Sequence, residues 1–137
     1  MPAARGQLTQ GSVVWARVSD PRGHQKLRPL VILTDSSEIV LDSPVVGVAV
    51  TTSFPDPPTR EYVELPWASH GHPATRLRRR SAAACRWLVR LLPSEVEDVK
   101  GYVPSKVLLL VMQRVRELAS DLPPDLDPSG KIGRAHV

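Results

Sequence analysis

Arg28-Pro29-Leu30-Val31-Ile32-Leu33-Thr34 is the stretch that decides the fold prediction. This apolar, β-branched run opens with a proline and closes with a polar Thr-Asp-Ser-Ser cluster, which is typical of a central strand. A second run, Val45-Val46-Gly47-Val48-Ala49-Val50-Thr51-Thr52, predicts a neighbouring strand with a possible β-bulge at its glycine. Antiparallel pairing would bring Arg28 close to Thr51 and Thr52 at one end of the sheet. A guanidinium and two hydroxyls on such a rigid edge suit the binding of a phosphate.

The segments around this pair predict further strands and one helix. Residues 11–18 alternate, with Val14, Ala16 and Val18 on one face, and residues 60–65 and 82–92 are predicted as strands on similar grounds. Residues 19–27 are predicted as a turn-rich loop and residues 93–99 as one short helical turn. Residues 104–119 predict a helix with an apolar stripe made of Val107, Leu108, Val111, Val115 and Leu118. About five or six short strands before a C-terminal helix predict a mainly β fold, a small SH3-like barrel.

Length and composition indicate a single-domain protein. The chain has 137 residues, of which 42% are apolar, and a formal net charge of +4. No apolar stretch reaches the roughly 18 residues that a membrane-spanning helix needs, and the N-terminus lacks the apolar segment of a signal peptide. Cys85 is the single cysteine, so an internal disulfide is excluded, and its apolar neighbours place it in the core. We therefore expect a cytoplasmic protein.

Four segments are expected along the chain. Residues 1–10 are predicted to be a flexible lead-in, 11–120 a single barrel domain, and 121–130 a disordered tail rich in proline and aspartate. Residues 131–137 match one reading frame of a common sequencing adapter, so we interpret them as an artefact that replaces the natural C-terminus. Removing the two charges of Lys131 and Arg134 lowers the net charge from +4 to +2, so overall charge argues only weakly for a nucleic-acid ligand.

Basic and aromatic side chains near the two strand ends are candidates for ligand binding. Lys26 precedes the first strand, and Arg78 and Arg80 belong to a basic cluster at residues 76–80. This cluster can contact an RNA backbone or form a solvated edge that discourages strand addition. Trp67 can stack on a base, with ordinary packing as the alternative.

Four fragments, taken together, resemble a known family. They are Gly-Ser-Val-Val-Trp at 11–15, Asp-Pro-Arg-Gly-His-Gln at 20–25, Arg-Pro-Leu-Val-Ile-Leu at 28–33 and Val-Thr-Thr at 50–52. Their order and spacing resemble the MazF/PemK family of toxin endoribonucleases over residues 11–119. Residues 77–88 are similar to a divergent branch of the same family.

The resemblance implies an SH3-like barrel, usually a homodimer, that cleaves single-stranded RNA without a metal and leaves a cyclic phosphate. It also implies a cognate antitoxin protein as partner, and nucleic-acid binding in general, of RNA or DNA. By position, Arg28 matches the arginine of the family's Arg-Pro signature, Thr51 the threonine that ends the third strand, and His24 a loop histidine of some members. These three are the predicted catalytic residues. The predicted RNA-binding residues are Lys26, Thr52, Arg78, Arg80 and Trp67.

Attack by an RNA 2′-hydroxyl needs a base, a group that stabilises charge on the phosphate oxygens, and an acid for the departing 5′-oxygen. Arg28 suits the charge, Thr51 can donate a hydrogen bond, and His24 can serve as base or acid because imidazole titrates near neutrality. Some family members carry an aspartate near the start of the penultimate strand, and this chain has no carboxylate there. The identity of the general base therefore stays open. His70 and His72 lack the company of cysteines or an HExxH arrangement, so neither a metal nor another cofactor is predicted.

Two other functions also stay open at this stage. The barrel could lack activity and bind RNA, an antitoxin peptide or another protein, which the missing carboxylate favours. It could instead inhibit a protein target such as gyrase, as a related barrel fold does. Incubation with a long single-stranded RNA in the presence of a chelator would separate cleavage from binding alone.

Overall fold

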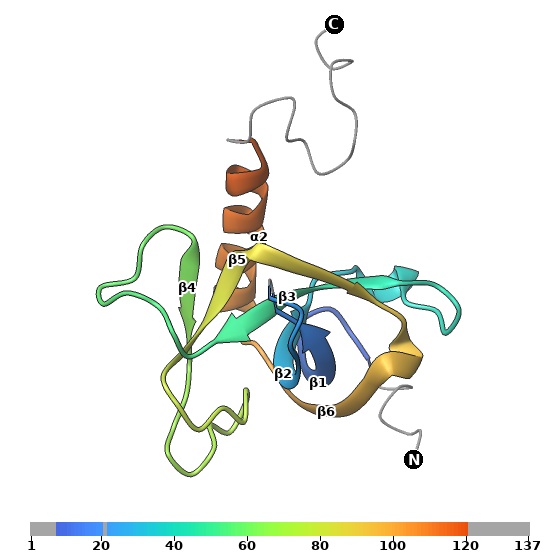
Figure 1. The fold of residues 1–137 in the computed structure, drawn as a ribbon, viewed down its shortest axis with the longest axis horizontal. Coiled ribbons are helices and arrows are strands. Elements are labelled where there is room, and N and C mark those ends of the chain that lie inside the picture. Colours follow the sequence, from blue (N-terminus) through green and yellow to red (C-terminus); the bar gives the residue numbers. More distant parts are fainter. Residues whose placement is uncertain (1–7, 21, 121–137) are drawn as a thin grey trace, which may run out of the picture.

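The computed structural model of the protein describes residues 8–20 and 22–120. In these residues one six-stranded antiparallel sheet precedes a C-terminal helix (Figure 1). The sheet order is β4-β5-β3-β2-β1-β6, with strands β1 (Ser12–Ser19), β2 (Gln25–Ile32), β3 (Val45–Thr51), β4 (Tyr62–Leu65), β5 (Ser81–Leu91) and β6 (Val96–Tyr102). The helical elements are η1 (Ser36–Glu38), η2 (Pro93–Glu95) and α2 (Ser105–Ser120). The predicted mainly β class with a C-terminal helix is confirmed.

Strand alternation sorts the apolar side chains into two cores, one on each face of the curled sheet. Val14, Ala16 and Val18 of β1 share one face, as predicted, while Val13 lies on the other. The helix-side core comprises Val13, Val31, Val48, Val50, Val63, Leu65, Leu77, Ala83, Cys85, Val103, Val111 and Leu118. The opposite core comprises Leu8, Val14, Ala16, Val18, Leu30, Ile32, Val45, Ala49, Leu91 and Val96.

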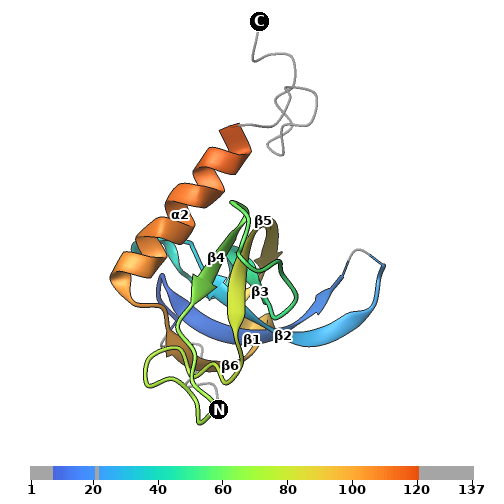
Figure 2. The same cartoon turned by 90° about the vertical axis from the view of Figure 1, so that its left-hand side faces the viewer.

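The helix α2 covers one side of the sheet, beside β4 and β5 (Figure 2). The predicted apolar stripe faces the sheet: Val111 and Leu118 are buried, and Val107, Leu108 and Val115 pack against the helix-side core. Burial of such a stripe is the main source of helix stability in a folded protein. The sequence-predicted helix is therefore confirmed within one residue at each end.

The strand β5 bends midway because its pairing with β3 is interrupted. The pairs Val48–Leu88 and Val50–Ala83 leave the four residues 84–87 of β5 opposite a single residue of β3. Extra residues in one strand of a pair produce a bulge and increase the local twist. The first half of β5 consequently pairs with β4, while its second half continues along β3.

Three local predictions are wrong. The loop predicted for residues 19–27 is shorter, because residues 25–27 pair with β1 in a hairpin and β2 begins at Gln25. The helical turn predicted for 93–99 ends at Glu95, because residues 96–99 pair with β1 as part of β6. The bulge predicted at Gly47 lies instead in β5. Gly47 pairs regularly, and a Cβ there would come within 3.3 Å of the Leu30 Cβ.

Residues 8–10, which were predicted to belong to a flexible lead-in, pack against the domain. Leu8 is buried in the opposite core, and the Gln10 side chain donates a hydrogen bond of 2.8 Å to the Leu33 carbonyl. The packed domain thus includes residues before Gly11. The predictions made for residues 1–7 and 121–137, including the disordered tail and the adapter-like segment, lie outside the described residues.

Candidate functional site

The ends of β2 and β3 bring Arg28 and Thr51 onto neighbouring strands. Leu30 pairs with Ala49, and the same register continued by two residues sets Arg28 opposite Thr51. Strand alternation puts both side chains on the face of Leu30 and Ala49, towards the opposite core. The two strand ends are thus neighbours in the fold, while the catalytic roles of the two side chains stay a prediction.

Arg28 carries a donor group that the described residues leave unused. Its guanidinium carbon lies 5.0 Å from the centroid of the Trp87 ring, in a cation–π contact. Its Nε atom is buried and has no hydrogen-bond partner among the described residues. A buried N–H without an acceptor costs about 1–3 kcal/mol, and arginine does not lose its proton to avoid this. An anionic oxygen from outside the chain would be stabilised here.

The hydroxyl of Thr51 is held by its own loop. Oγ1 accepts a hydrogen bond from the Ser53 backbone N–H at 3.0 Å and donates one to the Ser53 carbonyl at 3.3 Å. The second bond is long for an O–H donor. The hydroxyl hydrogen can therefore turn towards a better acceptor, such as a phosphate oxygen, without disturbing the turn.

The β1–β2 hairpin supplies a carboxylate that the sequence analysis missed. Oδ1 of Asp20 accepts backbone N–H groups of Arg22 and His24, both at 2.9 Å, and Oδ2 lies 3.7 Å from Nδ1 of His24. The hydrogen bond from the His24 backbone is the main cause that lowers the pKa of Asp20, and the charges of His24 and Arg28 act in the same direction. The signal was present in the sequence, because an aspartate that opens a turn accepts the N–H two residues on. Nδ1 of the exposed His24 thus faces this carboxylate, while the role of its ring in proton transfer stays a prediction.

Beside the strand ends lies a pocket with a volume of about 480 Å³, which we call the basic hollow. It lies where β2 and β3 part beyond the Leu30–Ala49 pair. Its basic lining residues are Lys26, Arg28, Arg76, Arg78, Arg79 and Lys100, and the others are Trp15, Leu27, Pro29, Val50, Thr52, Leu77 and Ser81. Among the described residues, six cationic ones and no acidic one line it. A concave wall with one sign of charge concentrates ligands of the opposite sign.

The loop of residues 66–80, between β4 and β5, presents most of these arginines and is fixed by internal hydrogen bonds. Thr75 is fully buried, and its Oγ1 donates to the Pro66 carbonyl at 2.7 Å and accepts from the Leu77 N–H at 3.2 Å. Nδ1 of His72 accepts the Ala74 N–H at 3.0 Å. His72 therefore has a structural role in the loop.

The same loop rests on β6 and holds Arg76 in an uncommon conformation. The Tyr102 N–H donates to the Ala74 carbonyl at 2.9 Å, and a Cβ on the adjacent Gly101 would overlap that oxygen. Arg76 has a φ of 66°, in the left-handed region that side chains rarely adopt. Such conformations persist where the surroundings fix them, and they concentrate at functional sites.

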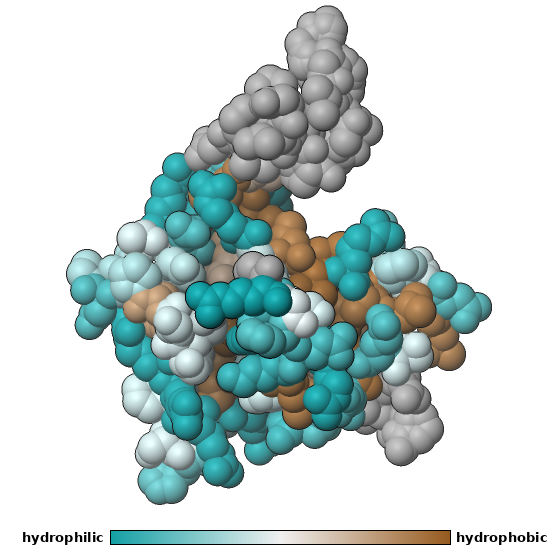
Figure 3. Space-filling model, in the orientation of Figure 1, coloured by the Kyte–Doolittle hydropathy of each residue, from teal (hydrophilic) through white to brown (hydrophobic). Residues whose placement is uncertain are grey.

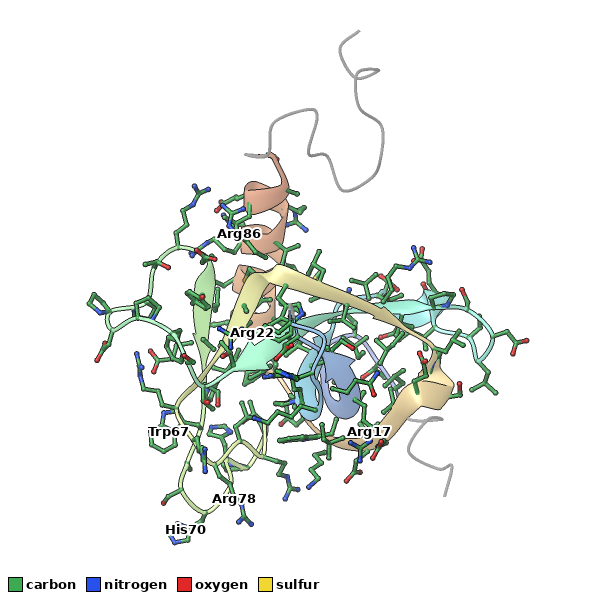
Figure 4. All side chains as sticks on the ribbon, viewed as in Figure 1. Arg17, Arg22, Trp67, His70, Arg78 and Arg86 are labelled. Carbon is green, nitrogen blue, oxygen red and sulfur yellow. The ribbon has the colours of Figure 1, made fainter. Side chains whose placement is uncertain are left out.

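Four predicted site residues, Thr51, His24, Arg80 and Trp67, do not line the basic hollow. Thr51 lies at the strand end beside Arg28, while its neighbours Val50 and Thr52 line the hollow. Arg80 pairs with Glu64 at 3.0 Å and Asp56 at 3.4 Å, so carboxylates of the chain neutralise its charge. His24 belongs to the exposed hairpin, and Trp67 is exposed on the loop of residues 66–80. Figure 4 shows Trp67 and Arg78 on the same side of the molecule, far from Arg86. Lys26, Arg28, Thr52 and Arg78 are the predicted site residues that do line the hollow.

Cys85 is buried in the helix-side core, as predicted, and burial raises the pKa of its thiol to about 11. Within residues 8–20 and 22–120, no three His, Cys, Asp or Glu residues are grouped so that they could hold a metal ion. No helix in this part of the chain is long and apolar enough to cross a membrane.

Solved structures of one class of protein share this arrangement of strands and helix. A MazE–MazF crystal structure from Deinococcus radiodurans has a TM-score of 0.62 and 19% identity, over 84% of this chain and 97% of that chain. An endoribonuclease in complex with its cognate antitoxin, from a mycobacterial species, has a TM-score of 0.62 and 17% identity, over 85% and 99%. The Mycobacterium tuberculosis toxin MazF-mt6 has a TM-score of 0.59 and 16% identity, over 82% and 98%. The fold is thus that of the MazF toxins.

The family itself is established by sequence. The model of the PemK-like, MazF-like toxins of type II toxin–antitoxin systems matches residues 9–119, and the chain belongs to this family. The resemblance found in the four fragments is confirmed. No curated protein sequence matches the chain. DNA binding, which we also expected, has no support among these comparisons.

Proposed function

We propose that the protein is the toxin of a toxin–antitoxin pair and cleaves single-stranded RNA by attack of a 2′-hydroxyl on the neighbouring phosphate. The observation that carries this proposal is the buried Nε of Arg28, which has no hydrogen-bond partner among the described residues. It lies at the end of β2, next to the end of β3 that carries Thr51. Family membership supports the toxin role, and a mycobacterial structure of the same fold, titled an endoribonuclease, supports the reaction.

In this reaction the 2′-oxygen bonds to phosphorus as its proton leaves, and the bond from phosphorus to the 5′-oxygen breaks. A proton delivered to that oxygen gives a 5′-hydroxyl end, and the other product carries a 2′,3′-cyclic phosphate. Arg28 stabilises charge on the non-bridging oxygens, assisted by the Thr51 hydroxyl. His24 exchanges the proton through Nε2, and Asp20 orients its ring through Nδ1. The nucleophile belongs to the substrate, so no step requires a metal ion.

Lys26, Thr52 and Arg78 are proposed to contact the RNA backbone, since all three line the basic hollow beside Arg28. Trp67 is proposed to stack on a base outside the hollow, because its ring is exposed on the adjoining loop. Arg80 is not carried forward, because Glu64 and Asp56 already neutralise it.

Two protein partners are proposed, an antitoxin and a second copy of the chain. The titles of the Deinococcus and mycobacterial structures name toxin–antitoxin complexes, which supports the antitoxin. Leu88 of β5 and Leu109 and Leu110 of α2 are exposed, and Figure 3 shows hydrophobic surface between α2 and β5. Apolar surface of this kind marks a protein interface, and sedimentation analysis of wild-type protein and Leu109→Asp would measure the dimer.

The test of the reaction is an RNA cleavage assay in the presence of EDTA, followed by analysis of the fragment ends. Wild-type protein is expected to give discrete fragments with cyclic phosphate ends, and Arg28→Ala is expected to give none in the time that wild type needs to cleave the RNA. Arg116→Ala, at an exposed position of α2, is the matched control and should cleave like wild type. Binding of RNA without fragments would replace the proposal with a non-catalytic RNA-binding barrel.

A further inference from the structure

We propose that the basic hollow and a smaller depression beside it hold two consecutive nucleotides of the RNA. The phosphodiester between these nucleotides would bind Arg76, Arg78 and Lys100. This inference rests on the proposed function and adds to it a second phosphate site, distinct from the one at Arg28. It also assigns a ligand contact to Lys100, for which the sequence analysis predicted no site role, and a definite one to Arg76, which that analysis placed only in a basic cluster.

The geometry that carries the inference is a border shared by two concave surfaces. The smaller depression has a volume of about 330 Å³ and is lined by His70, Gly71, Arg76, Arg78 and Lys100. The last three also line the basic hollow, so they stand where the two concave surfaces meet. Both volumes fall within the roughly 300–1,000 Å³ typical of small-ligand pockets.

The charges at this border are largely uncompensated. The side chains of Arg76 and Arg78 have no ion pair and no hydrogen-bond partner among the described residues. Lys100 has one long ion pair, 4.0 Å from Asp98, and its Nζ lies 5.7 Å from the centroid of the Trp15 ring. Arginine forks that are not engaged within the chain can bind a phosphate in a bidentate manner.

The hollow also offers surface for a base, which favours RNA over an acidic peptide. Beside the cations, its lining includes the half-buried Trp15 and the apolar residues Leu27, Pro29, Val50 and Leu77. Single-stranded nucleic acid is bound by cations that follow the backbone and by aromatic rings that stack on bases. Along such a strand, each phosphate lies between two nucleotides. The cationic border lies between two pockets in the same way, so each pocket can hold one nucleotide while the border binds the phosphate between them. A peptide rich in Asp and Glu would satisfy the cations without needing that alternation.

The border is also pre-organised. Arg76 and Arg78 come from the loop of residues 66–80, whose buried Thr75 fixes its shape, while Lys100 comes from β6. Gly101, next to Lys100, lets the loop and β6 approach closely. Cations held in place before binding lose little freedom when the ligand arrives, which favours affinity.

The test measures RNA binding by fluorescence anisotropy at several salt concentrations, with the full chain carrying Arg28→Ala so that RNA is not consumed. Arg78→Ala, Lys100→Met and Arg76→Asn are added singly, asparagine being chosen because it tolerates a left-handed backbone. Each is expected to weaken binding about 10- to 100-fold and to reduce the salt slope by up to about 0.7, the value for one phosphate. Arg116→Ala is the control and should change neither quantity.

A second measurement locates the phosphate. It uses a set of RNAs that each carry one neutral methylphosphonate linkage at a different position. At one position, the neutral linkage should weaken binding to the Arg28→Ala chain. The same linkage should not weaken binding to the chain that carries both Arg28→Ala and Arg78→Ala. Wild-type affinity and salt slope in all three border variants, or weakened binding only of an Asp- and Glu-rich peptide, would overturn the inference. Cleavage of RNA by the Arg28→Ala chain at the wild-type rate would instead overturn the proposed function, and the binding results would still test the border.

Discussion

Arg28 and Arg80 make the same kind of contact in two different regions, and the difference between them separates a structural arginine from a functional one. Each guanidinium carbon lies over an aromatic ring, Arg28 at 5.0 Å from the Trp87 centroid and Arg80 at 4.2 Å from that of Phe54. Arg80 also reaches two carboxylates, whereas the Nε of Arg28 is buried and finds no acceptor within residues 8–20 and 22–120.

An aromatic ring beneath an arginine orients the charge but does not neutralise it. Where the chain supplies carboxylates, as around Arg80, the site needs nothing from outside. Where it supplies none, the missing acceptor must come from a ligand or the buried N–H stays unsatisfied. The basic hollow also lacks carboxylates of the chain over a larger surface, because no acidic residue of the part that the structure describes lines it.

The largest expected effect concerns Arg28. Substitution Arg28→Ala should lower the RNA cleavage rate about 100- to 1,000-fold, as loss of one charge-stabilising donor does in other enzymes. The free energy of unfolding should change by less than about 1 kcal/mol, because a cation–π contact and an unsatisfied N–H are removed together. Single-turnover kinetics and urea denaturation measure the two quantities. A large loss of stability with retained cleavage would make Arg28 a structural arginine like Arg80.

The next effect concerns the support of the basic hollow. Substitution Gly101→Ala would force the Ala74 carbonyl away from β6, and we expect a loss of about 1–3 kcal/mol in the free energy of unfolding. RNA affinity should fall with it, since the loop carries Arg76 and Arg78. Gly23→Ala is a useful comparison, because a Cβ there meets nothing within 4 Å although its φ is also unfavourable. Equal RNA affinity in both variants would show that the loop position is unimportant for binding.

A smaller effect is expected for Arg80. Substitution Arg80→Ala should lower the free energy of unfolding by about 0.2–1 kcal/mol for each partly exposed ion pair lost. The cleavage rate should stay within about twofold of wild type, since a surface pair remote from the chemistry leaves the transition state unchanged. Thermal denaturation in low and high salt checks this, because screening should shrink the difference. A loss of cleavage as large as that of Arg28→Ala would erase the contrast between the two arginines.

The smallest effect concerns Cys85, which shows how a buried group behaves when it can stay neutral. Burial raises the pKa of its thiol from 9.0 to about 11, so the folded protein should resist thiol reagents at pH 8. Below pH 9 the stability should not depend on this thiol. From pH 9 to 11 the unfolded chain ionises while the folded chain does not, so wild type should lose stability relative to Cys85→Ala. Rapid alkylation of the native protein would contradict the burial.

Local patterns predicted much of this fold, and contacts distant in sequence account for what they missed. The alternation of Val14, Ala16 and Val18 and the stripe along α2 are periodicities visible within one segment. The end of η2 at Glu95 was missed because pairing with β1 overrides the local preference for a helical turn.

The candidate site divides in the same way. Arg28 and Thr51 could be placed together because their two strands pair in one simple register. The basic hollow could not be derived, because Trp15, Arg76 and Lys100 meet only when β1, the loop of residues 66–80 and β6 are all in place. Asp20 was visible as a turn residue, but its proximity to the charge of Arg28 was not.

The interrupted pairing of β5 has a consequence for how this protein can vary. The four residues 84–87 of β5 lie opposite a single residue of β3, and Trp87 is the last of them. The register of the second half of β5 determines on which side of the sheet the Trp87 ring beside Arg28 lies. Deleting or inserting one residue there, with the Val50–Ala83 pair kept, would shift the second half of β5 by one residue against β3. That shift would turn the Trp87 ring to the other side of the sheet, away from the guanidinium. Relatives that differ in length at this point should therefore hold their arginine by some other means.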